Sequence, residues 1–82
     1  MNSPHAYAAD PSLSKLVRLY GVERTETLVR DTLREIGIPA LHSADDRMRF
    51  GTALIKKGGL LEAIGRAIRI QAILHGASED SP

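Results

Sequence analysis

The chain has 82 residues and no cysteine, with 43% hydrophobic and 26% charged residues and a net charge of +1 at pH 7. This composition predicts one folded domain and excludes a disulfide framework and a thiolate metal site. Residues 1–10 contain no secretory signal, and no apolar run reaches the roughly 18 residues of a membrane span, so we expect a cytoplasmic protein. A single domain this small has a thin core and usually needs very regular helix packing or a partner subunit.

The first half of the chain predicts an arm and two helices. Residues 1–10 show no periodicity, which predicts a flexible N-terminal arm. In residues 11–20 apolar side chains recur every three or four positions, as on one face of a helix, and Gly21 ends that helix. Residues 22–36 repeat the pattern, and Gly37 ends the second helix.

The second half predicts two more helices and a tail. Ser43 is a good N-cap for a third helix that runs to about Lys57, because its hydroxyl can accept from a free N–H of the first turn. The pair Gly58-Gly59 breaks that helix, and residues 60–74 form the fourth. Residues 77–82 are polar and predict a disordered tail.

The predicted fold class is therefore all-α, a compact bundle of about four short helices. Residues 11–76 make up the single helical domain. No segment shows the alternating pattern of a strand, and no internal repeat is present.

The fourth helix is apolar on nearly every side, and its charged strip is narrow. Such a helix is predicted to be central and buried, and three short neighbours would struggle to cover all of it. We therefore expect it to self-associate or to bind another protein, with Gly65 allowing a close helix crossing. The residues expected at this partner or oligomer interface are Leu60, Leu61, Ile64, Gly65, Ile68, Arg66 and Arg69.

The segment around Gly21 has the outline of a helix-turn-helix, a DNA-binding motif. In that interpretation Arg24, Thr25 and Thr27 open the recognition helix and contact DNA. Thr27, however, stands where the second helix of the motif normally buries its first apolar residue. The alternative interpretation is a plain helical hairpin.

A second possible nucleic-acid footprint lies in residues 47–75, where six basic residues and one acidic residue give a local charge of +5. Cations in such a cluster can neutralise phosphates, although aromatic residues for base stacking are absent from it except Phe50. The candidate contacts are Arg47, Arg49, Lys56 and Lys57. The alternative is a solvated basic face.

No catalytic or metal-binding pattern is present, and we expect neither an enzyme nor a cofactor. The three histidines, His5, His42 and His75, are far apart and lack the helical spacing of a zinc site. The acidic pair Asp45-Asp46 stands at the start of a helix, where helix capping explains it.

Two functional hypotheses remain. The first is a small non-enzymatic interaction or regulatory protein that acts through a buried hydrophobic helix face, either as a homo-oligomer or as a subunit or inhibitor of a larger partner. The second is a small helix-turn-helix-like DNA-binding regulator that dimerises through its C-terminal helix. The misplaced Thr27 favours the first hypothesis, and the basic balance of residues 47–75 mildly favours the second.

Overall fold

The computed structural model describes residues 11–77, and its helices are α2 (Pro11–Ile36), α3 (Ala44–Lys57) and α4 (Gly59–Leu74). The predicted arm at residues 1–10 and the predicted tail beyond Ala77 lie outside this part. The all-α class is confirmed, and the described residues include no strand. None of these helices is long and apolar enough to span a membrane.

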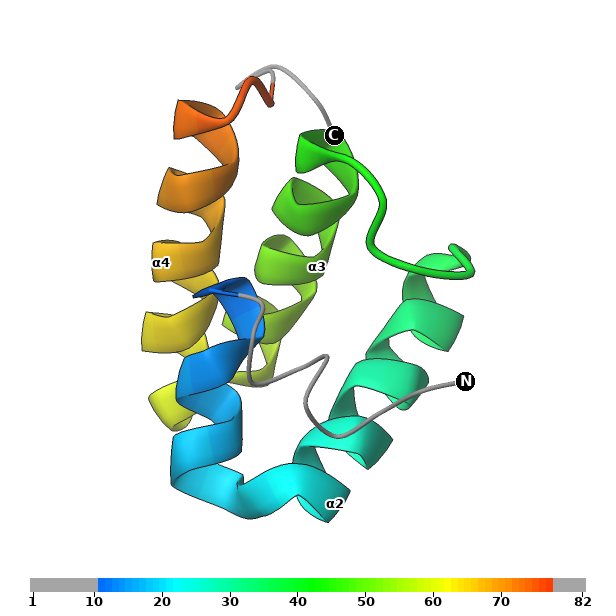
Figure 1. Cartoon of the computed structure of the whole chain (residues 1–82), viewed down its shortest axis with the longest axis vertical. Coiled ribbons are helices and arrows are strands. Elements are labelled where there is room, and N and C mark those ends of the chain that lie inside the picture. The colour runs from blue at the N-terminus through cyan, green and yellow to red at the C-terminus, as the bar shows by residue number, and fades with distance from the viewer. Residues whose placement is uncertain (1–10, 78–82) are drawn as a thin grey trace.

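The prediction of about four helices was slightly wrong, because the first two form the single bent helix α2. Gly21 leaves the helical conformation, with φ 82° and ψ 169°, yet helical structure continues directly on both sides of it. Figure 1 shows the result as a sharp corner between residues 11–20 and residues 22–36. Positive φ is accessible to glycine without steric cost, so the chain turns within one residue and needs no loop.

Local signals set the start of α3 as the sequence predicts. The Ser43 hydroxyl accepts from the backbone N–H of Asp46 at 3.1 Å, and the Asp46 carboxylate accepts from the backbone N–H of Ser43 at 3.2 Å. The backbone N–H of His42 donates to the same carboxylate oxygen at 3.0 Å. The His42 and Ser43 hydrogen bonds favour the ionised form and hold the pKa of Asp46 below its ordinary value.

The main core forms where α2, α3 and α4 meet, and Figure 1 shows α3 between α4 and the second half of α2. Phe50 and Leu54 of α3 are fully buried at its centre. The other buried members come from both halves of α2 and from α4: Leu13, Leu16, Val29, Ile64 and Ile68. The central helix is therefore α3.

The expectation that the C-terminal helix would be central was wrong. One face of α4 is buried against the chain's own helices, whereas Leu60, Ile70 and Leu74 on other faces are largely exposed. Among the described residues only α2 and α3 are available to cover it, and these two helices also pack against each other. An almost wholly apolar helix therefore lies at the edge of the bundle.

Ala77 extends the ordered domain by one residue beyond the predicted boundary. Its backbone N–H donates to the Ala72 carbonyl at 2.9 Å, and its side chain packs in a small second cluster with Met48 and Ala72. Gly76 has a φ of 107° and makes the turn that this closure requires.

Candidate interaction surfaces

The inner face of α4 belongs to the chain's own core. Ile64, Gly65 and Ile68 are buried there, and Gly65 lies directly against Gly51 of α3. These three residues were expected at a partner interface, but α2 and α3 already cover them. The close helix crossing predicted for Gly65 exists, and the helix that it crosses is α3 of the same chain.

The other predicted interface residues divide between the core and the surface. Leu61 is partly buried against the main core, and the aliphatic stem of Arg69 lies over Gly51. Leu60 is exposed, as is Arg66, which is paired with Glu62 at 2.8 Å one turn away. Of the predicted set, only Leu60 and Arg66 are freely accessible to another molecule.

The outer face of α4 carries a continuous apolar stripe. Its members recur at alternating spacings of three and four residues, which places them along one side of the helix. All five are exposed, and the three large ones have exposed fractions of 59% (Leu60), 60% (Ile70) and 73% (Leu74). We call Leu60, Ala63, Ala67, Ile70 and Leu74 the outer stripe of α4.

A groove beside the first half of the outer stripe widens this surface. It lies between residues 11–20 of α2 and the start of α4, and Leu19 on its wall is 50% exposed. The cations of Lys15 and Arg18 line the same groove, next to Leu60 and Ala63. The surface is therefore apolar along α4 and basic near the N-terminal end of that helix.

Sequence reasoning missed Leu19 and four members of the outer stripe. The three- and four-residue spacing of residues 60, 63, 67, 70 and 74 was available in the sequence. The apolar residues Leu61, Ile64, Ile68 and Ala72 on another face of α4 also recur every three or four residues, and periodicity alone cannot tell which stripe meets α3.

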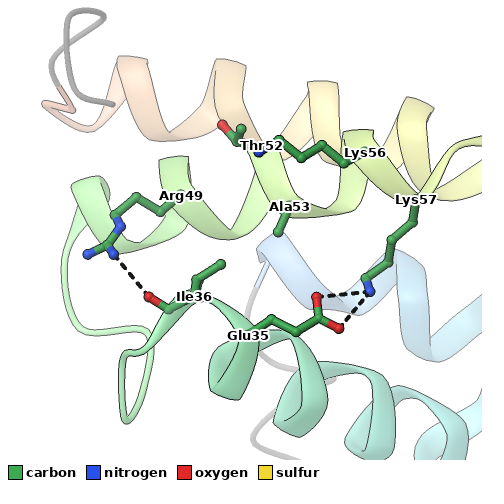
Figure 2. Close-up of a pocket in the computed structure, with 7 residues that line it drawn as sticks. All are labelled: Glu35, Ile36, Arg49, Thr52, Ala53, Lys56 and Lys57. Atoms are coloured by element: carbon green, nitrogen blue, oxygen red, sulfur yellow. Dashed lines mark hydrogen bonds and ion pairs between the residues drawn. The ribbon is translucent and has the colours of Figure 1, made fainter.

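A separate hollow of about 390 Å³ lies between α3 and the end of α2, and its lining includes Arg49, Lys56 and Lys57 of α3 (Figure 2). Arg49 donates to the Ile36 carbonyl at 3.0 Å and so caps the C-terminus of α2. Lys57 pairs with Glu35 at 3.2 Å. Both cations hold α3 to α2, whereas no dashed line joins Lys56 to the other residues that line this hollow (Figure 2).

The residues considered for helix-turn-helix contacts are not all accessible from solvent. Thr25 is completely buried, so it cannot reach a base edge. Arg24 is exposed and stacks its guanidinium 5.5 Å from the centre of the Tyr20 ring, and Thr27 is exposed.

Arg47, the remaining candidate of the second nucleic-acid footprint, is half-buried and donates to the Leu41 carbonyl at 3.4 Å.

Within residues 11–77, no group of three histidine, aspartate or glutamate side chains is placed to hold a metal ion. Comparison with protein-family models, with curated proteins and with solved structures finds no match to this chain.

Proposed function

We propose that this chain is a small non-enzymatic interaction protein that assembles with a second copy of itself through the outer stripe of α4. The observation that supports the proposal is the exposure of three large aliphatic side chains in one line on one helix. Isolated exposed leucines are common, but a contiguous apolar surface on a small protein usually marks an interface.

The composition of the outer stripe favours a helix as the occupant. Alternation of three and four residues is the spacing with which helices pair side by side, and the small side chains of Ala63 and Ala67 allow a second backbone to come close. A second copy of α4 presents the same length, the same spacing and the same apolar chemistry.

Paired substitutions on the two faces of α4 test the proposal. Ile70→Asp places a charge in the outer stripe, and we expect it to make the protein monomeric in light scattering while its helical circular dichroism stays unchanged. Ile68→Asp is the matched control, because Ile68 is 2% exposed in the core and a buried unpaired charge should unfold the chain.

Two outcomes would contradict the proposal. The first is a wild-type protein that is monomeric up to millimolar concentration, which would leave a different protein as the occupant of the outer stripe. The second is an Ile70→Asp variant that assembles as tightly as the wild type, which would place the self-association elsewhere on the chain.

DNA binding is the less supported function. Thr25 is buried, and Arg49 and Lys57 are engaged in intramolecular contacts. Fluorescence anisotropy with a mixed-sequence duplex at about 50 and about 200 mM salt tests it, because several phosphate contacts would make affinity fall by orders of magnitude over that range. We expect no such fall.

A further inference from the structure

We infer that the two copies of α4 pair antiparallel, with Ile70 of each copy seated on Ala67 of the other and Leu74 seated on Ala63. This inference rests on the self-association proposed above and adds the orientation and register of the pair. Three independent features of the described residues support it: side-chain size, the distribution of charge, and the end of the helix.

Side-chain size selects the register. The outer stripe has its two alanines in the middle of the helix and two of its three large side chains, Ile70 and Leu74, toward the C-terminal end. An antiparallel pair with its twofold axis between residues 68 and 69 places a large side chain opposite a small one at every central layer. Such alternation fills the space between helices without voids.

A parallel pair in register packs less well. It places Ala63 on Ala63 and Ala67 on Ala67, which leaves a gap, and then Ile70 on Ile70 and Leu74 on Leu74, which forces the helices apart. The two copies of α4 would diverge toward their C-terminal ends. Two neighbouring helix dipoles also repel each other when they run in the same direction.

The charges beside the outer stripe select the same orientation. Lys15 and Arg18 lie next to Leu60, at the N-terminal end of α4. In a parallel pair these cations would approach the same cations of the second copy. In an antiparallel pair they approach the C-terminal end of the other α4 instead.

That C-terminal end is suited to receive cations. The carbonyls of Gln71, Ala72 and Ile73 accept backbone N–H groups, but the aligned peptide dipoles still give a helix C-terminus a partial negative charge, and basic residues in the last turn usually compensate it. The last turn of α4 contains none. Lys15 and Arg18 of the second copy would supply this missing charge, and Leu19 beside them would cover the last apolar turn.

Single-cysteine variants test the orientation directly, because the natural chain contains no cysteine. We expect an equimolar mixture of Ala63→Cys and Leu74→Cys to give a disulfide-linked dimer under mild oxidation, while either variant alone gives almost none. Ala67→Cys mixed with Ile70→Cys provides a second pair, in case loss of the Leu74 side chain weakens assembly.

The outcomes separate the orientation from the assembly itself. Efficient linking of Leu74→Cys to itself, with no gain in the mixture, would overturn the antiparallel register and leave the dimer standing. A wild-type monomer in light scattering together with no linking in any mixture would overturn both.

Charge reversal gives an independent readout. The double variant Lys15→Glu, Arg18→Glu should weaken dimerisation about tenfold, since it removes two cations from the C-terminus of a neighbouring helix and adds repulsion there. Lys56→Glu is the control, because Lys56 lines the separate hollow between α2 and α3. Equal dimerisation constants for the double variant and the control would contradict the placement of the cations.

Discussion

Gly51 and Gly65 bring the backbones of α3 and α4 into direct contact. A β-carbon built on Gly65 would lie 2.5 Å from the carbonyl oxygen of Gly51 and 2.9 Å from the backbone nitrogen of Ile55. Both neighbours are backbone atoms of a packed helix, so they cannot rotate away. The crossing of the two helices therefore requires glycine at position 65.

Gly65→Ala should destabilise the protein by about 1–3 kcal/mol, although alanine is the better helix former. The added methyl group overpacks the crossing, and this cost outweighs a gain in helix propensity of about 1 kcal/mol. Urea unfolding followed by circular dichroism measures the difference.

The gain in stability that comes from helix propensity alone can be measured at Gln71, an exposed position of the same helix. Gln71→Ala should be more stable than Gln71→Gly by about 1 kcal/mol. If Gly65→Ala also gained about that amount, the backbones would not be in contact at the crossing.

Two threonine hydroxyls are buried without a hydrogen-bond partner within the described part of the chain. Thr25 and Thr32 have exposed fractions of 0%, and neither Oγ1 has an acceptor or donor in reach. Burying an unpaired hydroxyl costs about 1–3 kcal/mol. Thr25→Val and Thr32→Val, which keep the shape of the side chain, should each raise the free energy of unfolding by about that amount.

Thr27→Val is the matched control for both substitutions, because Thr27 lies on the exposed side of the same helix. Its unfolding free energy should stay within about 0.5 kcal/mol of the wild type. A loss of stability in Thr32→Val would mean that its hydroxyl has a hydrogen-bond partner in solution.

The corner of α2 and the boundaries of α3 and α4 could be predicted because each depends on a few neighbouring residues. Gly21 changes the chain direction, Ser43 caps α3, and Gly58 separates α3 from α4, as their types and positions indicate. These features follow from backbone conformation and from hydrogen bonds within a single turn.

The distribution of buried residues could not be predicted in the same way. Thr25 and Thr32 have polar side chains and were not expected in the core, yet both are buried. On α4 the sequence offers two apolar stripes, and the one that faces inward packs in the main core and includes the contact between Gly51 and Gly65. That contact joins residues of two helices, and no local pattern records it.

The capping box at Ser43 should make stability depend on pH in the acid range. Because hydrogen bonds lower the pKa of Asp46 in the folded state, its carboxylate stabilises the protein above the ordinary value of 3.8. This contribution should disappear as the pH falls through the lower folded-state pKa. Urea unfolding between pH 2 and pH 7 should show the wild type and Asp46→Asn converging at the acid end.

Two further variants control this experiment. Ser43→Ala removes the other half of the capping box and should cost about 1 kcal/mol at neutral pH. Asp31→Asn removes an exposed carboxylate from the second half of α2, outside the capping box, and serves as the comparison. If the pH dependence were as large for Asp31→Asn as for Asp46→Asn, the loss of stability in acid would not come from the capping box.

The cost of replacing Gly21 at the corner of α2 should come from backbone conformation and not from a lack of space. With φ at 82° the residue lies where L side chains are strained, yet an added β-carbon would meet nothing within 4 Å. Gly21→Ala should therefore cost about 1–3 kcal/mol. Gly21→Asn should cost about as much, because the combination of φ 82° and ψ 169° is essentially confined to glycine and lies outside the left-handed helical region that asparagine tolerates.

Equal costs for the two substitutions would distinguish Gly21 from Gly65, where any side chain meets backbone atoms. At position 65 we expect asparagine to be worse than alanine, because its larger side chain overpacks the crossing further. Urea unfolding of all four variants, under identical conditions, gives the comparison. If asparagine cost clearly more than alanine at position 21 as well, lack of space would limit both glycines.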